Sequence, residues 1–371
     1  MGTSRATCAV VGLGQGLEDL YCTLYHPRFD VRAVCDPNPA AYGWITGQER
    51  LEDSGKDIAS SPHHLAWVEQ IRKAPEAGAI EYVADFQQLL DRDDVEAVVL
   101  VVPDKLHEPY VLRALEAGKY VLCTKPMALS LDGALRIAEA ARRHPGHYML
   151  GFQMTYSPFA RVLLDVIASG EIGDVRQLRF DYHRKPWRPM HSTKNADVDG
   201  AIIKEGTHWL DLIYRLGGQR PWRAVSAFGA IDELGGTVEF EDNGVLIVDY
   251  DGFRAAHTFS YFRRADPVED FLLVGSKGTV RGTFERLTVE TDDGERVVDV
   301  PGHALPYQHH VGYYEMIDEF ARVVLDGHEP YTDWRTGLEN MLVCHASQVA
   351  VMDGRTVRRE ELRDRDWRAT G

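Results

Sequence analysis

Short apolar runs alternate with amphipathic helical patterns over the first 150 residues, and this alternation limits the possible folds more than any other feature of the sequence. The apolar runs are rich in Val, Leu and Ala, which is typical of strands buried on both faces. Such strands belong to parallel sheets covered by helices on both sides. The predicted strands are Thr7–Val11, Val31–Cys35, Ala97–Val102, Tyr120–Cys123 and Tyr148–Phe152, and helical patterns lie between them, as at His107–Ala117 and Asp132–His144.

The segment from Ala40 to Ile80 interrupts this alternation. It is polar, contains Gly, Ser and Pro, and is longer than an ordinary strand–helix connection of about 2–6 residues. We therefore expect a partly helical insertion at one edge of the sheet.

A different pattern follows Phe152. Between Arg223 and Val300 many short alternating segments are separated by Asn-Gly and Asp-Gly steps, which favour hairpin turns. The second part is therefore predicted to be an α+β domain with a large, open, mainly antiparallel sheet, so that the whole chain is α/β with domains at 1–150 and 151–371. Further elements are expected at Pro158–Ser169, Val175–His183, Thr207–Leu216, Tyr313–Leu325 and Trp334–Met352.

Composition and charge exclude several classes of protein. The formal net charge of -16 disfavours nucleic acid as a partner. No apolar run approaches the ~20 residues that span a bilayer, and the start does not resemble a secretory signal, so we expect a cytoplasmic protein without membrane contact. The five cysteines are isolated along the chain, which favours buried reduced thiols over a metal site or disulfides.

A glycine-rich turn follows the first predicted strand and precedes a helix. Gly12 and Gly14 permit a tight turn and close approach of a pyrophosphate, and the helix N-terminus offers free N–H groups. The pattern is imperfect, because Leu17 stands at the usual third glycine while Gly16 lies one place early. Glu18 and Asp19 also place negative charge in the first helical turn, where they suit the helix dipole but could repel a pyrophosphate. A purely structural turn is the alternative.

Asp36 strengthens the dinucleotide interpretation. It ends the second predicted strand, about 20 residues after the glycines, where a carboxylate would bind the ribose hydroxyls. The alternative is a turn residue before Pro37. A carboxylate here would repel a 2′-phosphate, and no Lys or Arg follows before Arg50. The sequence therefore predicts a Rossmann domain that binds NAD rather than NADP, with Gly12, Gly14, Gln15, Gly16 and Asp36 in the cofactor site.

Beyond this point the sequence resembles the Gfo/Idh/MocA family of oxidoreductases, which includes glucose-fructose oxidoreductase and inositol dehydrogenase, over nearly its whole length. Each of the resembling segments is loose alone, but their order and spacing match the family. The segments are Val102–His107, Ala117–Leu122 followed by Thr124-Lys125-Pro126, Gly151-Phe152-Gln153, Ser169–Gly173, Gly206–Asp211, and the ending from Pro330 to Arg355.

The resemblance implies roles for individual residues. Lys125 would lie near the nicotinamide and stabilise the developing alkoxide of the substrate. His208 would be the general acid/base, because a reference pKa of about 6.5 suits proton transfer near neutrality; its alternative is a helix histidine held by Asp211. Added to the cofactor site are Val102, Pro103, His107, Thr124, Pro126 and Gln153.

Three positions depart from the family pattern. Thr124 stands where the family has Glu before the lysine, and Thr155, followed by Tyr156, stands in place of a frequent Arg. Lys204 occupies the place of an Asp four residues before the histidine, with Glu205 next to it. A cation there would favour a neutral His208 or bind an anionic substrate. We therefore count Lys204 among the catalytic candidates.

The substrate side is expected around residues 181–188, which are dense in aromatic and cationic groups. Aromatic rings stack on sugar faces, and Arg can pair with a carboxylate or phosphate; a solvated basic strand end is an equally weighted alternative. His309, His310 and Tyr313 begin the late predicted helix and are expected near the same cleft. Adjacent helical residues such as His309 and His310 point apart, so no metal site is predicted. Predicted substrate contacts are Tyr156, His183, Trp187, Arg188, Glu205 and Asp211.

These features predict an NAD-dependent dehydrogenase that acts on a CH–OH group of a polyol, sugar or cyclitol. Two alternatives stay open: a redox-neutral enzyme that cleaves glycosides through a keto intermediate with catalytic NAD, and a sensor that kept the fold without the chemistry. Lys204 and Tyr156 would serve the first alternative as extra acid/base groups. The open sheet face and the family resemblance predict a homodimer or homotetramer.

Overall fold

The computed structural model describes residues 4–54, 61–185, 201–235, 241–264, 268–306 and 312–364. The chain divides into two compact units. The first comprises Met1–Ala128, Gly133–Tyr156 and His303–Leu338, and the second comprises Leu129–Asp132, Ser157–Gly302 and Glu339–Gly371. The first unit thus joins most of the first 156 residues to a late segment, 303–338, which the predicted boundary had placed in the second domain.

The first unit contains a parallel sheet with the strand order β3-β2-β1-β4-β5-β6, which confirms the predicted doubly wound Rossmann fold. Four strands lie within a few residues of their predicted positions, while β4 is shorter and β3 had not been predicted. The strands are β1 (Ala6–Val11), β2 (Phe29–Cys35), β3 (Glu81–Val83), β4 (Ala97–Leu100), β5 (Tyr120–Thr124) and β6 (Tyr148–Gly151).

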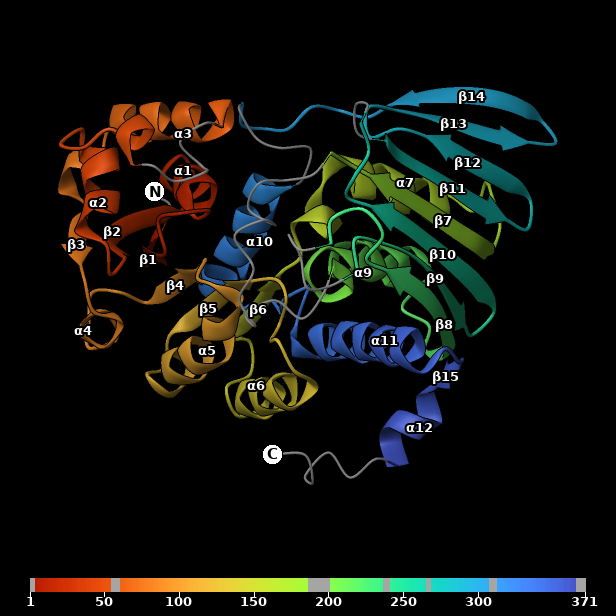
Figure 1. Ribbon diagram of the computed structural model, residues 1–371. Helices are drawn as coiled ribbons and strands as arrows, with labels where there is room; N and C mark the ends of the chain where they lie inside the picture. The colour runs from red at the N-terminus through yellow and green to blue at the C-terminus, as the bar shows by residue number, and fades with distance from the viewer. Residues whose placement is uncertain are drawn as a thin grey trace. The chain divides into compact units, whose positions relative to one another are not determined.

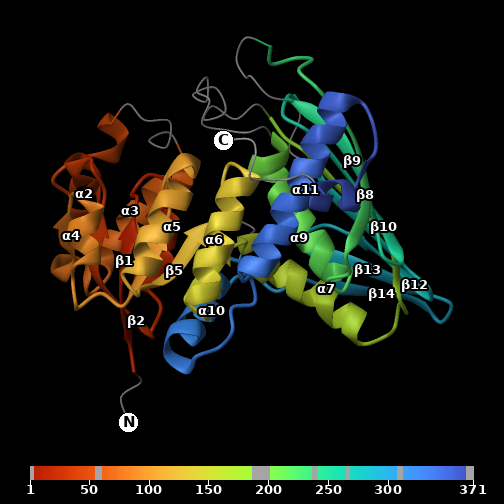
Figure 2. The ribbon, with the colours of Figure 1, turned by 90° about the horizontal axis from the view of Figure 1, so that it is seen from below.

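Helices cover both faces of this sheet (Figures 1 and 2). On one face, α1 packs against α10, and their apolar residues share a buried core with β1. On the other face, α5 packs on β4 and β5. The expected insertion at 40–80 contributes α2 and α3. The helices of this unit are α1 (Leu17–Leu24), α2 (Pro39–Thr46), α3 (Pro62–Lys73), α4 (Phe86–Leu90), α5 (His107–Glu116), α6 (Leu131–Arg143, beginning in the second unit's segment) and α10 (Tyr313–Asp326).

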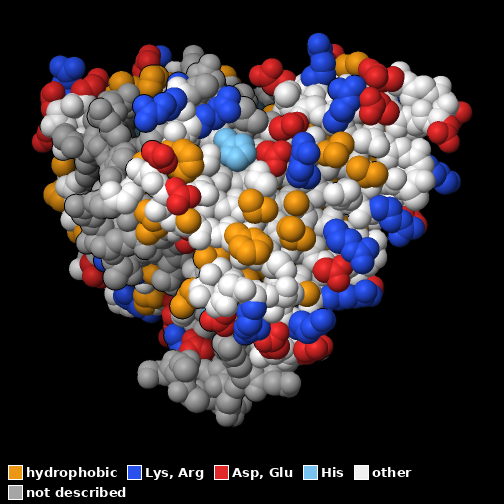
Figure 3. All heavy atoms as spheres, turned by 45° about the vertical axis from the view of Figure 1, so that its right-hand side comes forward, with side chains coloured by type: hydrophobic (Ala, Val, Ile, Leu, Met, Phe, Trp, Pro, Cys, Tyr) orange, Lys and Arg blue, Asp and Glu red, His pale blue; other side chains and the backbone are white. Residues whose placement is uncertain are grey.

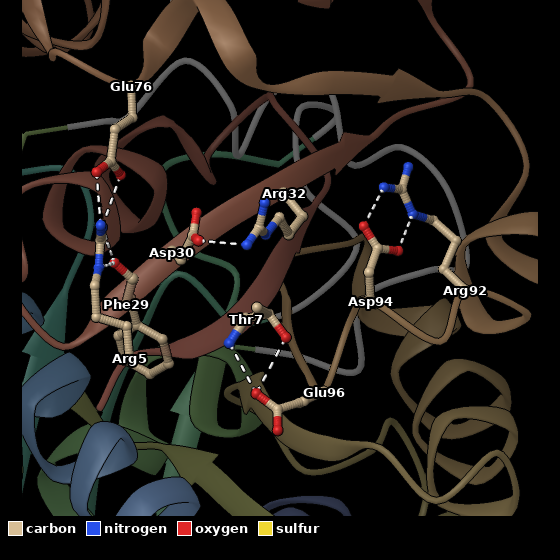
Figure 4. A network of polar contacts seen from close by, with 9 residues as sticks. All are labelled: Arg5, Thr7, Phe29, Asp30, Arg32, Glu76, Arg92, Asp94 and Glu96. Atoms are coloured by element: carbon tan, nitrogen blue, oxygen red, sulfur yellow. Dashed lines mark hydrogen bonds and ion pairs between the residues drawn. The ribbon is translucent and has the colours of Figure 1, made fainter. Parts of the chain in front are cut away.

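Polar pairs tie the chain together at the amino ends of these strands (Figure 4). The Arg5 guanidinium donates to both carboxylate oxygens of Glu76 at 2.7 Å, and its Nε donates to the Phe29 carbonyl at 2.8 Å. The backbone N–H and the hydroxyl of Thr7 donate to Glu96 at 3.0 and 3.1 Å. Exposed pairs of this kind contribute only about 0–1 kcal/mol each. The opposite, carboxyl edge of the sheet carries the glycine turn.

The second unit contains a mainly antiparallel sheet with the order β14-β13-β12-β11-β7-β10-β9-β8-β15, in which only the described pair β7–β10 is parallel. This confirms the predicted α+β architecture. The strands are β7 (Val175–His183), β8 (Trp222–Ala230), β9 (Asn243–Tyr250), β10 (Phe253–Ser260), β11 (Val268–Gly275), β12 (Gly278–Gly282), β13 (Arg286–Thr291), β14 (Gly294–Asp299) and β15 (Val357–Arg358).

Helices cover one face of this sheet. Alternate residues of β7, such as Leu178 and Phe180, point to this face, and the Phe180 ring lies 5.3 Å from the ring of Trp209. The helices are α7 (Pro158–Ala168), α9 (Thr207–Leu216), α11 (Trp334–Asp353, beginning in the first unit's segment) and α12 (Arg359–Asp364). None of the described helices has the length and apolar character needed to cross a membrane. All five cysteines are buried free thiols, as expected.

His257 is a titratable group inside this second core. It is 2% exposed on β10, its Nδ1 lies 3.1 Å from the Phe180 carbonyl, and its ring stacks on Trp209. Burial is the main cause that lowers its pKa to about 4, from an ordinary value of 6.5. The folded chain therefore holds this imidazole neutral, and Nδ1–H donates to the carbonyl.

We predict that acid destabilises the protein partly through His257. Because its folded pKa lies below its unfolded pKa, the stabilisation is complete above about pH 6.5 and is lost as pH falls towards 4, up to about 3 kcal/mol. His257→Asn keeps a donor near the carbonyl and does not titrate, so its Tm should fall less than that of the wild type between pH 7.5 and pH 5. The exposed His328→Asn should behave as the wild type, and equal Tm losses in all three proteins would contradict the assignment.

Candidate active site

The glycine turn is tightly packed at two of its three glycines. Gly12 has φ +92°, and a Cβ there would lie 2.1 Å from the Val101 carbonyl oxygen. A Cβ on Gly16 would lie 2.1 Å from the Gly12 carbonyl oxygen and 3.1 Å from the Val101 Cβ. Gly16 therefore provides the close helix–strand contact expected of a third glycine, and Leu17 is free to enter the core, where it is fully buried.

Gly14 differs from its neighbours, because nothing lies within 4 Å of a Cβ built on it. It stands next to the N-terminus of α1, where the first helical hydrogen bond runs from Leu20 N–H to the Gly16 carbonyl. The backbone N–H groups before Leu20 therefore have no acceptor within the helix. An open glycine beside such donors is the arrangement that admits a pyrophosphate.

Asp36 ends β2 and is bound to the turn itself. One carboxylate oxygen accepts the Leu13 N–H at 2.8 Å, and the other accepts the Asn38 N–H at 2.9 Å. Each oxygen keeps a further lone pair for another donor. Asp36 thus fixes the glycine turn and can also accept from ribose hydroxyls. This first role was not predicted, because no local pattern distinguishes a carboxylate that binds a distant N–H.

His107 joins the two loops that follow β4 and β5. It is fully buried, and its ring nitrogens lie 2.6 Å from the Pro126 carbonyl and 3.0 Å from the Val102 carbonyl. Burial is the largest effect on its pKa, which is lowered from the ordinary value. The imidazole therefore fixes the position of the loop that carries Lys125, which is half-buried beside Pro126.

Two other predicted residues of the first unit are held by long-range hydrogen bonds. The Gln153 amide donates to the Tyr313 hydroxyl at 3.2 Å, which links the turn after β6 to α10. The Tyr156 hydroxyl lies 2.8 Å from the Thr332 hydroxyl, which itself donates to the Leu150 carbonyl at 2.6 Å. Thr332 was not predicted, because a partner so far from Tyr156 in the sequence leaves no local pattern.

In the second unit, a π-helical segment at Ile202–Gly206 precedes α9 and carries Lys204 and Glu205. The sequence did not predict it. π-Helical turns are rare and occur often at functional sites. Glu241 accepts the Ile202 N–H at 3.1 Å, and Asn340 binds both the hydroxyl and the carbonyl of Thr207. The start of α9, and with it His208, is therefore fixed from two sides.

Asp211 lies deeper in α9 than a substrate contact would. Its carboxylate is 3.3 Å from the Arg215 guanidinium, and both side chains have no exposed surface. Removing one partner of such a buried ion pair strongly destabilises the folded protein, because the other charge is left buried without compensation. We therefore assign Asp211 to the support of α9, while His208, 9% exposed, lies nearer the surface of the unit.

His183 lies on the other face of the sheet from α9. On β7 it follows Arg179 and Asp181, which alternate with the buried residues that face the helices. Its Nδ1 lies 2.9 Å from the Ser260 hydroxyl on β10. Its predicted role as a substrate contact stays a prediction. Trp187, Arg188, His309 and His310 lie outside the described residues.

Within the described residues, no three His, Cys, Asp or Glu side chains gather as metal ligands do. Of the remaining predicted contacts, Gln15 and Pro103 are exposed loop residues, Val102 is a half-buried loop residue, and Thr124 is half-buried at the end of β5.

Two models of one protein family match this chain. Residues 58–152 match the family model described as the oxidoreductase family with an NAD-binding Rossmann fold, and residues 161–281 match the GFO/IDH/MocA C-terminal domain. The first match begins after the glycine turn, so the interpretation of that turn depends on its own geometry.

Curated relatives and solved structures agree with the family models. An oxidoreductase of Bacillus subtilis, YrbE, is 25% identical over 301 residues, 78% of this chain and 85% of the relative. The dTDP-3,4-didehydro-2,6-dideoxy-alpha-D-glucose 3-reductase of Streptomyces violaceoruber is 28% identical over 268 residues, 66% of this chain and 75% of the relative.

An oxidoreductase from Agrobacterium radiobacter, solved with NAD+, L-tartaric acid and magnesium, has a TM-score of 0.79 at 17% identity and covers 97% of this chain and 100% of its own. The fold is thus the same over almost the whole length. The chain belongs to the GFO/IDH/MocA family of oxidoreductases and has its NAD-binding Rossmann domain.

Proposed function

We propose that the protein is a dehydrogenase that transfers hydride between a ring carbinol of a sugar, sugar derivative or cyclitol and the nicotinamide of NAD. The observation that carries this proposal is the open Gly14 at the N-terminus of α1, between two glycines that admit no side chain, with Asp36 bound to the same turn. The sugar substrate of the Streptomyces violaceoruber relative supports the substrate class.

In this proposal the cofactor residues are those of the glycine turn, Asp36 and the loops joined by His107. The Asp36 carboxylate favours NAD over NADP, because it would repel a 2′-phosphate. The bound cofactor supplies the site that accepts the hydride. Cofactor contacts are thus assigned to Gly12, Gly14, Gln15, Gly16, Asp36, Val102, Pro103, His107, Thr124, Pro126 and Gln153.

The proton and the developing charge are handled by side chains of this chain. The Lys125 ammonium donates a hydrogen bond to the reacting hydroxyl and stabilises its alkoxide character as the C–H bond breaks. His208 accepts the hydroxyl proton during oxidation and returns it during reduction. Lys204 adds a second cation on the π-helical segment, which suits a substrate with an anionic group. Tyr156 and Glu205 complete the proposed substrate contacts.

We predict that substitutions at Gly14 and Gly16 separate stability from cofactor binding. Gly16→Ala should lower the Tm and abolish NAD binding, because its Cβ would collide with the Gly12 carbonyl. Gly14→Ala should leave the Tm unchanged, since its Cβ meets nothing, yet weaken NAD binding about tenfold or more where the pyrophosphate approaches. Calorimetry and thermal unfolding measure both quantities.

Gly78→Ala is the matched control in the same unit, because it too has open space around its Cβ. If Gly14→Ala binds NAD as well as the control does, the pyrophosphate lies elsewhere.

We predict turnover with a polyol or sugar that depends on Lys125. Purified protein, NAD and a panel of polyols, sugar acids and glycosides are followed by reduced-nicotinamide absorbance and product mass. Lys125→Ala should lower kcat by about 10²–10³-fold, as expected for loss of a charge at the transition state, and the exposed Lys277→Ala should not. Glycoside cleavage without net cofactor reduction would favour the redox-neutral alternative. Absence of turnover in both directions would favour a sensor.

We also propose a homo-oligomer that covers the face of the second sheet on which β8 and β9 expose apolar side chains. Phe228 and Val245 are paired across these strands and are 69% and 40% exposed, and Ile247 is 48% exposed. Figure 3 shows hydrophobic side chains at the centre of one face of the molecule, with charged side chains around them. Such a patch is typical of an interface.

We predict that Phe228→Lys combined with Ile247→Lys gives a monomer by sedimentation velocity, because two charges would have to be buried in the contact. Met352→Lys, an exposed apolar position on α11, should leave the assembly intact. A wild-type monomer at micromolar concentration would contradict the proposed assembly and leave the enzymatic proposal unaffected.

A further inference from the structure

Two buried acids occupy the first turn of α1. Glu18 and Asp19 are 2% and 1% exposed. Carboxylates so deeply buried are ordinarily paired with cations or several donors. In the described part of the chain, one carboxyl oxygen of Asp19 is buried without a hydrogen-bond partner. Asp19 is therefore in an environment that disfavours its charged form.

The elements packed on α1 bring further acids and neutral groups towards Asp19. Tyr313 begins α10, which lies beside α1 (Figure 1), and the charges of both acids contribute to raising its pKa, after burial. Gln153 binds the Tyr313 hydroxyl, and its own buried amide oxygen has no partner among the described residues.

Other titratable groups line the surrounding elements. Cys22 lies one turn along α1. Burial first, and then the charges of Glu18, Asp19 and Glu315, raise the pKa of its thiol. His303 lies 3.6 Å from Glu315, and α3, also packed on α1, contributes the buried His64.

These surroundings raise the pKa of Asp19 well above its usual value, through burial first and the charge of Glu18 second. The sequence alone suggested that two carboxylates in this turn would repel a pyrophosphate. In the structure, the deep burial of Asp19 and its unpartnered carboxyl oxygen favour the protonated form of this carboxyl. With Asp19 protonated, Glu18 alone of these two acids opposes an anion at the N–H groups and dipole of the first turn.

We propose that Asp19 couples cofactor binding to protonation: NAD binds to the form in which the Asp19 carboxyl carries its proton, and ionisation of this carboxyl weakens NAD binding. This inference rests on the proposed position of the pyrophosphate at the N-terminus of α1. In the NAD-bound form the carboxyl carries its proton, which an ionised Asp19 takes up from solvent, and no bond of the cofactor changes. The coupling is reciprocal, so bound NAD raises the affinity of Asp19 for its proton.

The same group affects stability with a defined sign. An acid whose pKa is raised on folding contributes stability below its unfolded pKa, and this contribution is lost as pH rises through the folded pKa. The Tm of the NAD-free protein should therefore fall as pH rises through the folded pKa of Asp19, and the Tm of Asp19→Asn should fall less.

The test measures the Kd of NAD by calorimetry from pH 5.5 to 9. In the wild type, affinity should fall about tenfold or more as pH rises, as expected for a charge introduced near two phosphates. Asp19→Asn, which keeps the shape and cannot ionise, should show a flat profile. Asp93→Asn, an exposed acid of the same unit, should follow the wild type. ADP-ribose should show the same pH slope as NAD, because it carries the same pyrophosphate.

A second measurement needs no variant. Calorimetry of the wild type in buffers of different ionisation enthalpy should show proton uptake when NAD binds within the pH range of the transition. NAD binding without pH dependence or proton uptake would overturn the inference, as would an Asp19→Asn profile that parallels the wild type, or a slope present for NAD and absent for ADP-ribose. Failure of NAD to bind at every pH would instead overturn the proposed cofactor site itself.

Discussion

The carboxyl edge of the first sheet depends on one close approach of backbone to backbone. Gly12 and Gly16 face Val101 and each other at distances that leave no room for a Cβ. This contact brings the end of β1, the start of α1 and the end of β4 together, and Asp36 fixes the same turn from β2. Because the interior is close-packed, the position of every later group at this edge follows from that contact.

The second unit positions its candidate catalytic residues differently. Lys204 and His208 lie on a π-helical segment and the first turn of α9, whose backbone is held by Glu241 and Asn340. π-Helical turns are rare, and this one is held by contacts from outside the helix. The buried pair of Asp211 and Arg215 anchors the rest of α9. The candidate catalytic side chains thus depend on contacts that come from distant parts of the chain.

Most of the fold could be predicted from the sequence, because it depends on local periodicity. The bounds of β7 and the start of α9 were predicted to the residue, and the glycine turn was recognised despite Leu17. What could not be predicted depends on pairs far apart in the chain: Asp36 with Leu13, His107 with two carbonyls, and Tyr156 with Thr332. β3 also could not be predicted, because its three residues are too few for a periodic signal.

The place of α10 in the first unit has a consequence for biosynthesis. Its residues Met316, Ile317 and Phe320 are fully buried in the core shared with α1 and β1, although they are translated after strands β7 to β14 of the second sheet. The nascent Rossmann sheet therefore leaves the ribosome with an apolar face uncovered, and that face is covered only near the end of synthesis. A fragment cut after the sixth strand would keep this face exposed and is expected to aggregate, so the cofactor domain and the rest of the chain mature together.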